Sequence, residues 1–86
     1  MWYVYLVRCI DASLYCGITN DVNKRVEKHN KGLGAKYTKT RGPVALVYVE
    51  EQPSKSDALK REWHIKHRLS KAEKKALVKS YEQKTS

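Results

Sequence analysis

Two tyrosine-bearing segments and an arginine supply residue types that could hydrolyse a phosphodiester. Tyr3-Val4-Tyr5 precedes Tyr15-Cys16-Gly17 by one expected turn, and Arg25 lies on the element that follows. A phenol can accept a proton when nearby positive charge lowers its pKa from about 10. An arginine offers a phosphate a permanent charge and planar donors as negative charge grows in the transition state. The set predicts a site that attacks phosphodiesters.

Each of these side chains also has a structural interpretation. Tyrosines are favourable in strands and pack well when half buried, so Tyr5 and Tyr15 could serve the core alone. Arg25 could be a surface residue paired with Asp21, four residues earlier. His29 lies one turn after Arg25, and a helical histidine is more often solvated or merely hydrogen-bonded than catalytic. The spacing leaves both interpretations open.

A carboxylate in the second half of the chain falls on a helical face that should be buried. On a wheel of about 100° per residue, Glu62 lies within the apolar arc of the helix expected near residues 54–69, whose members are Ala58, Leu59, Trp63, Ile65 and Leu69. A buried carboxylate is unfavourable unless it is paired, hydrogen-bonded or bound to a cation. An ion pair with Lys66 would satisfy Glu62. So would Mg²⁺, which accepts a single protein carboxylate together with waters and substrate phosphate.

The charge of the chain favours a polyanionic partner. Its 86 residues include 18 Lys and Arg against 9 Asp and Glu, a formal net charge of +9. Nucleic acid is the natural partner for such an excess, although a solvated basic surface remains the simpler alternative. No apolar run approaches the roughly 20 residues of a membrane span, and no helix shows a broad apolar face opposite its lysines. We expect a cytosolic protein without a secretory signal.

The elements that must position these residues begin with a β-hairpin over residues 2–10 and 14–19. With Asp11-Ala12-Ser13 as a three-residue loop, Ile10 would face Leu14. Tyr3, Tyr5, Tyr15, Gly17 and Thr19 would then share one face of the sheet. A slip of one residue would separate Tyr5 from Tyr15. Cys9 and Cys16 are interpreted as small buried hydrophobes rather than as a disulfide or a metal site.

The remaining segments complete a small α+β fold. We expect a helix from about residue 21 to Lys31, stopped by Gly32, then a loop over residues 32–43. The apolar run at 44–49 predicts the central strand. Helices should follow from Ser54 to about Leu69 and from Ser70 to about Tyr81. The order β-β-α-β-α-α gives a three-stranded sheet flanked by helices. It forms a single domain over residues 1–82 with a frayed tail at 83–86.

The ordered set of motifs resembles the GIY-YIG nuclease superfamily, in particular its small stand-alone bacterial members. The resemblance rests on Tyr3-Val4-Tyr5, Tyr15-Cys16-Gly17, Arg25, His29 and the helical Glu62. It extends to Gly34-Ala35-Lys36-Tyr37-Thr38 and to the segments at 43–44 and 58–62. Tyr3-Val4 replaces the Gly-Ile of the first family motif and Cys16 replaces the middle residue of the second. These replacements alter packing more than chemistry.

The resemblance implies a role for each matched residue. Tyr5 would be the general base that takes a proton from water, and Tyr15 would orient the water or the scissile phosphate. Arg25 would stabilise the pentacovalent phosphate, and His29 would contact or polarise the phosphate or Tyr5. Glu62 would hold one divalent cation, Mg²⁺ or Mn²⁺, that stabilises the leaving 3′ oxygen. Catalytic candidates are therefore Tyr5, Tyr15, Arg25, His29 and Glu62.

Other basic and aromatic residues are candidates for gripping a nucleic-acid backbone without sequence readout. They are Lys24, Lys28, Lys36, Tyr37, Lys39, Arg41 and Lys66, with Lys55 and Arg61 as further basic positions. The implied activity is a metal-dependent endonuclease with little sequence specificity or with structure preference, acting on DNA rather than RNA. A protein partner could supply the specificity that a second domain gives to other members. The alternative is a nucleic-acid-binding module of the same fold with little or no turnover.

Overall fold

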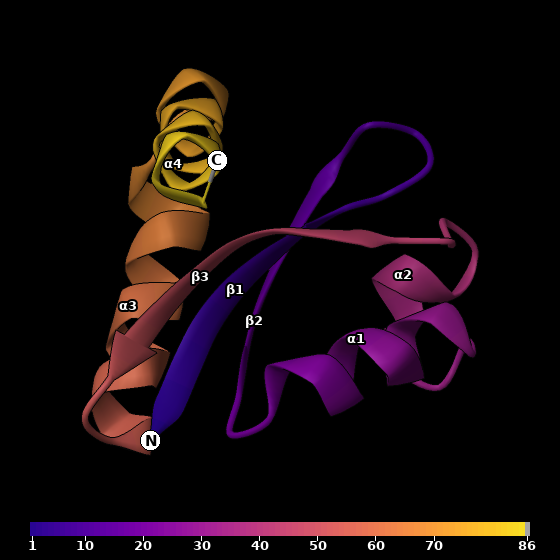
Figure 1. Ribbon diagram of the computed structural model, residues 1–86, viewed down its shortest axis with the longest axis horizontal. Helices are drawn as coiled ribbons and strands as arrows, with labels where there is room; N and C mark the ends of the chain where they lie inside the picture. The colour runs from indigo at the N-terminus through magenta and orange to yellow at the C-terminus, as the bar shows by residue number, and fades with distance from the viewer. Residues whose placement is uncertain (86) are drawn as a thin grey trace.

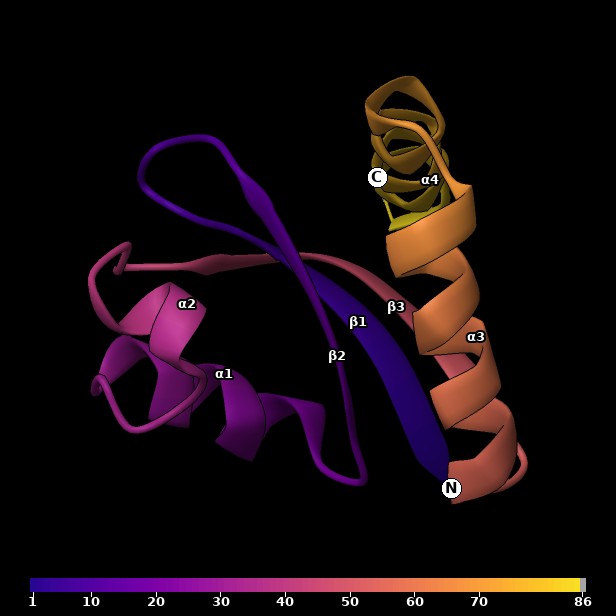
Figure 2. The same cartoon turned by 180° about the vertical axis from the view of Figure 1, so that it is seen from behind.

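The computed structural model describes residues 1–85 and shows an antiparallel three-stranded sheet between two helical layers (Figure 1). Helices α1 and α2 cover one face, and α3 and α4 lie on the other, as the reverse view also shows (Figure 2). The α+β class and the order of the main elements are confirmed. The elements are β1 (Trp2–Arg8), β2 (Leu14–Thr19), α1 (Val22–Asn30), α2 (Lys36–Lys39), β3 (Ala45–Gln52), α3 (Lys55–Arg68) and α4 (Lys71–Thr85).

The hairpin has the predicted faces but a wider loop than expected. Leu14 pairs with Arg8 rather than with Ile10, and Tyr5 lies opposite Gly17. The loop is wider because the Cys9 amide donates to the Ser13 carbonyl at 2.8 Å. Cys9 and Ser13 therefore close the turn, instead of Ile10 and Leu14. The register therefore differs from the expected one by an even number of residues, which leaves every side chain on its predicted face. Tyr5, Tyr15 and Gly17 share one face as predicted.

The prediction that the third strand is central was wrong. The strand order is β2-β1-β3, so β1 lies in the middle and β3 forms an edge. Val4, Tyr5, Leu6 and Val7 are consecutive and all buried, since helices cover both faces of β1. A continuous apolar run indicates burial on both faces, and in this sheet β1 meets that condition more fully than β3.

Most helix boundaries agree with the capping residues in the sequence. Asp21 accepts the amide of Lys24 at the start of α1, and Gly32 after α1 has a φ of 76°. Ser54 caps α3 through the amide of Asp57. The segment expected to be a continuous loop at 32–43 contains the short helix α2, and α4 extends to Thr85 instead of ending near Tyr81. The last residue of the expected tail, Ser86, lies outside the described residues.

Helix α3 is rotated relative to the predicted apolar arc. Ala58 and Ile65 are fully buried against the sheet, whereas Leu59 and Trp63 are 46% and 52% exposed. Arg61, which the wheel placed outside the arc, turns toward β3 and pairs with Glu50 at 3.1 Å. The arc was therefore centred too far toward Trp63. No helix within residues 1–85 is both long and apolar enough to cross a membrane.

Candidate active site

A buried hydroxyl on the central strand joins residues from β1 and α1. Tyr5 Oη lies 2.8 Å from His29 Nε2, and Arg25 Nε donates to the same oxygen at 3.3 Å. Tyr5 and His29 are almost completely buried, with 0% and 1% exposure. Arg25 therefore reaches from α1 to Tyr5 on β1. It is not paired with Asp21, whose side chain caps α1.

The hydrogen bonds fix the tautomer of His29. Thr38 Oγ1 donates its only proton to the Ala35 carbonyl at 3.0 Å. It must therefore accept from His29 Nδ1, which is 2.7 Å away, so the proton of a neutral imidazole lies on Nδ1. Nε2 is then the acceptor for the Tyr5 hydroxyl, and Arg25 donates to the same phenol oxygen. His29 is thus a neutral base whose acceptor nitrogen points at the tyrosine.

Two glycines make room for this pair. A Cβ at position 17 would lie 2.5 Å from Tyr5 Oη, and a Cβ at position 34 would overlap the His29 imidazole. Each side chain is therefore packed against a backbone that carries no Cβ. The second tyrosine motif needs its glycine because Tyr5 lies across it in the β1–β2 pair.

Burial keeps both members of the pair neutral near pH 7. Burial raises the pKa of Tyr5, and the nearby Arg25 guanidinium opposes this only in part. Burial and the adjacent Arg25 charge both lower the pKa of His29 below its usual range. Tyr5 is therefore a neutral phenol that can pass its proton to a neutral imidazole as it receives another.

Tyr15 extends the cluster toward the other helical layer. Its ring packs edge-on against His29, with centroids 5.4 Å apart, and stacks on Tyr37 of α2 at 5.8 Å. On α3, Lys66 Nζ lies 5.5 Å from the centre of the same ring. The structure thus brings Tyr5, Tyr15, Arg25 and His29 together, and these four residues form what we call the tyrosine cluster.

Glu62 lies beside β2 but makes no described contact with Tyr5 or His29. Its Oε2 is 3.5 Å from Lys66 Nζ, and its side chain is 20% exposed. Helix α3, which carries Glu62, packs against β2. Burial, followed by the Glu62 charge, raises the pKa of the Cys16 thiol to about 12. Glu62 is linked to the tyrosine cluster through Lys66, the ion-pair partner suggested by the sequence.

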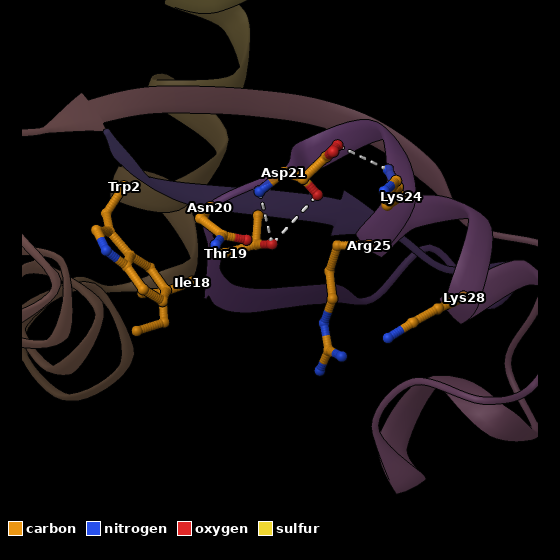
Figure 3. Close-up of a pocket in the computed structure, with 8 residues that line it drawn as sticks. All are labelled: Trp2, Ile18, Thr19, Asn20, Asp21, Lys24, Arg25 and Lys28. Carbon is orange, nitrogen blue, oxygen red and sulfur yellow. Dashed lines mark hydrogen bonds between the residues drawn. The ribbon is translucent and has the colours of Figure 1, made fainter.

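A surface cavity opens next to Arg25 at the end of β2. It has a volume of about 260 Å³ and is lined by Trp2, Ile18, Thr19, Asn20, Asp21, Lys24, Arg25 and Lys28. Figure 3 shows Arg25 and Lys28 extending from α1 on one side, with Trp2 and Ile18 on the other. Arg25 both lines this cavity and contacts Tyr5 Oη, so it connects the buried hydroxyl to the surface.

The other basic candidates have different surroundings. Lys24 and Lys28 line the Arg25 cavity, and Lys36 and Lys39 are exposed on α2. Arg41 pairs with Asp11 at 3.2 Å, and its guanidinium lies 4.1 Å from the Tyr37 ring centre. Arg61 is held by Glu50, and Lys55 Nζ lies 5.3 Å from the Trp2 ring centre. Arg41 and Arg61 are therefore engaged within the protein.

The sequence did not predict a role in the site for Thr38 or Gly34. In the structure Thr38 is the hydrogen-bond partner of His29, and Gly34 leaves room for the His29 ring. Both lie in the segment at 34–38 that carries part of the family resemblance. A threonine three residues after Ala35 can return its hydroxyl to that carbonyl, which was a local signal for the turn. Its second partner, His29, could be found only from the fold.

Comparison with known proteins agrees with this fold. The model of the GIY-YIG catalytic domain matches residues 1–76. The chain therefore belongs to the GIY-YIG nuclease family, whose activity implies binding of nucleic acid. UPF0213 proteins from Staphylococcus aureus strains Mu50 and N315 are each 64% identical to it over 64 residues, 74% of this chain and 78% of theirs. The solution NMR structure of a UPF0213 protein from Bacillus halodurans is 48% identical and has a TM-score of 0.58. That alignment covers 92% of this chain and 84% of the other.

Proposed function

We propose that this protein is a divalent-metal-dependent endonuclease that hydrolyses phosphodiester bonds in DNA, with low sequence specificity or a preference for particular DNA structures. The main support is the position of Tyr5 Oη between a neutral acceptor and a cation, 2.8 Å from His29 Nε2 and 3.3 Å from Arg25 Nε. A tyrosine used only for packing would not need both partners. Membership of a nuclease family supports the same conclusion.

In the proposed reaction, water attacks phosphorus and the bond from phosphorus to the 3′ oxygen breaks. The water proton passes to Tyr5 Oη while the original phenol proton passes to His29 Nε2. This transfer never requires a free tyrosinate, which the raised pKa of Tyr5 would disfavour. Arg25 offers its charge to the phosphate oxygens as their negative charge grows. Tyr15 orients the water or the phosphate.

Access to Tyr5 requires a small movement of Arg25. The hydroxyl is buried, and Arg25 lies between it and the surface cavity. A phosphate bound in the cavity would draw the guanidinium outward, since a contact between two opposite charges is stronger than a long hydrogen bond from the guanidinium to a neutral phenol, here 3.3 Å. Movement of this long side chain would admit the attacking water to Oη. Lys24 and Lys28 would hold the adjacent backbone.

The residues present are compatible with a single cation at Glu62. Oε2 makes only a loose, partly exposed pair with Lys66, and such pairs contribute about 0–1 kcal/mol. Among the side chains of residues 1–83, Oε1 has no hydrogen-bond or ion-pair partner. Mg²⁺ or Mn²⁺ needs only one such carboxylate when waters and phosphate complete its shell. When bound, the metal would act as a Lewis acid and stabilise the leaving 3′ oxygen.

A binding module with little turnover is the second candidate. The observation in its favour is the Glu62–Lys66 pair, because a carboxylate that stays paired with Lys66 would not recruit a metal. The basic cavity would bind a backbone equally well in that case. Cleavage assays on duplexes, forks, flaps and single strands with Mg²⁺ or Mn²⁺ separate the two functions.

The critical test replaces Glu62. We expect Glu62→Ala to abolish metal-dependent nicking while the fold is retained, as measured by gel assay and by NMR spectra of the amides. Glu51→Ala is the matched control because Glu51 is an exposed carboxylate on β3. Cleavage that survives Glu62→Ala would overturn the metal assignment. Binding without cleavage by the wild-type protein over the whole panel would favour the module.

A further inference from the structure

A second basic cavity lies at the opposite end of β2 from the Arg25 cavity. Its volume is about 380 Å³, and it is lined by Asp11, Ala12, Ser13, Leu14, Tyr37, Lys71, Lys74 and Lys75. Leu14 is the first residue of β2, whereas Thr19 at the other cavity is the last. The two cavities therefore lie at the two ends of the strand that carries Tyr15 and Gly17.

The charge in this cavity is largely uncompensated. Its three lysines come from the first turns of α4, and none of them forms an ion pair with the side chains described at residues 1–83. Asp11 is the one acidic residue among the described residues that line this cavity. Its carboxylate already forms an ion pair with Arg41 at 3.2 Å and accepts a hydrogen bond from the Ser13 amide at 3.0 Å. The Ser13 contacts, followed by Arg41, lower the pKa of Asp11. The cavity thus presents net positive charge to a ligand.

One wall of this cavity packs against the tyrosine cluster. Tyr37 lines the cavity and stacks on Tyr15, which packs against His29. Arg41 fixes Tyr37 by lying over its ring and by donating to its carbonyl at 2.9 Å. The lysines of α4 are therefore connected to the residues around Tyr5 through Tyr37 and Tyr15, and Tyr15 is a residue of the edge strand β2.

We propose that the Lys71, Lys74 and Lys75 cavity is a second nucleic-acid subsite, which binds backbone phosphates several nucleotides from the bond that is cut. Its role beside a scissile bond rests on the proposed function, whereas its binding of a phosphate backbone does not. The 6 residues of β2 extend over roughly 20 Å, the rise of about six nucleotides in one strand of B-form DNA. A strand that enters at Arg25 and passes Tyr15 reaches these lysines.

The subsite is tested with a double substitution and a matched control. Lys74→Gln/Lys75→Gln removes two charges from the cavity, and Lys60→Gln/Lys79→Gln removes two exposed charges outside both cavities. Binding is measured without divalent metal by fluorescence anisotropy at several salt concentrations. The probes are an oligothymidylate of about 12 nucleotides and the matching oligouridylate.

We expect the cavity variant, which lacks two charges, to lower the slope of log Kd against log salt by about 1.4, and the control variant to leave it near the wild-type value. The amide NMR signals of residues 71–75 and Tyr37 should shift when the wild-type protein binds. The two probes show whether DNA or RNA is preferred, and the proposal requires the effect with at least one of them.

The outcomes separate this proposal from the proposed function. Equal salt slopes for the two variants, in a protein that still cleaves DNA, would overturn the subsite and leave the nuclease function in place. A lower slope for the cavity variant in a protein that cleaves nothing would support the subsite and contradict the nuclease function. A wild-type protein that binds neither probe would overturn the subsite, and the cleavage panel would then decide the nuclease function separately.

Discussion

The two faces of the sheet are built from different kinds of side chain, although alternate residues of the same strand supply them. On the α3 and α4 side, Val4 and Leu6 pack against Ala58 and Ile65 in an apolar core. On the α1 and α2 side, Tyr5 lies with His29 and Thr38, all of them buried and hydrogen-bonded. The period of two in β1 thus places the larger apolar core on one face. The other face holds the hydrogen-bonded polar residues beside a smaller apolar cluster that includes Val7 and Val44.

The two faces should respond differently to small changes. Apolar contacts are non-directional, so a conservative replacement costs free energy roughly in proportion to the buried volume that is lost. Buried polar contacts depend on single atoms, because a donor or acceptor that loses its partner cannot be compensated by water. The comparison predicts that the first face controls unfolding and the second controls catalysis.

The largest expected effect is the loss of the Tyr5 hydroxyl. Tyr5→Phe should reduce kcat by about 10²–10⁴-fold, since the path from water to His29 passes through that oxygen. Steady-state cleavage assays and binding without metal are the measurements. DNA binding should remain close to wild type. A parallel loss of binding and cleavage would instead indicate a structural tyrosine.

The same comparison is tested from the opposite face at Ile65, which is fully buried. Ile65→Ala should lower the free energy of unfolding by about 2–5 kcal/mol, and Ile65→Val by about 0.5–1.5 kcal/mol. Urea unfolding measures both. The folded Ile65→Val protein should keep its kcat, so a large fall in kcat at full occupancy of the folded state would show that the two faces are not separable.

A smaller effect is expected from the residue that holds His29. Thr38→Val removes the partner of Nδ1 and should lower kcat by about 10²-fold with little change in KM, because His29 loses its fixed tautomer and orientation. Thr38→Ser keeps the hydroxyl and should restore most of the rate. If the serine variant were as slow as the valine variant, packing rather than the hydrogen bond would explain the loss.

The smallest effect concerns pH. Because the pKa of His29 is lowered on folding, the unfolded chain binds its proton first as the pH falls. The free energy of unfolding should therefore be maintained above about pH 6.5, which is the ordinary pKa of histidine. It should decline as the pH falls below that value and level off once His29 is also protonated in the folded protein. Urea unfolding and an NMR titration of the His29 ring measure this. The exposed-histidine variant His64→Gln/His67→Gln should retain the decline, and a wild-type protein without any decline would contradict the neutral His29.

Local signals in the sequence were sufficient for much of the fold. The caps at Asp21 and Ser54 and the stop at Gly32 located the helices. Side-chain alternation placed Tyr5 and Tyr15 on one face even though the loop length was wrong, because only the parity of the register matters for the face. These features depend on neighbours within a few residues.

Features that depend on tertiary contacts were not predictable from these patterns. β1 is central and is buried by both helical layers. The rotation of α3 buries Ala58 and Ile65 against the sheet and is accompanied by the Arg61 pair with Glu50. For the candidate site, the sequence could propose the residue types but not the Arg25 contact with Tyr5 or the Thr38 contact with His29. Both contacts join elements that lie far apart in the sequence.

The glycine opposite Tyr5 also bears on how this protein can vary. Every replacement of Gly17 adds at least a Cβ, and that atom would lie 2.5 Å from the phenol oxygen. Cys16, next to it, packs in the apolar core on the other face of the sheet and has no such constraint from the tyrosine. One strand therefore holds a position limited by the volume of the apolar core beside a position limited to glycine. A variant with any other residue at position 17 would displace the Tyr5 hydroxyl. Under the proposed function, such a protein would lose the cleavage step.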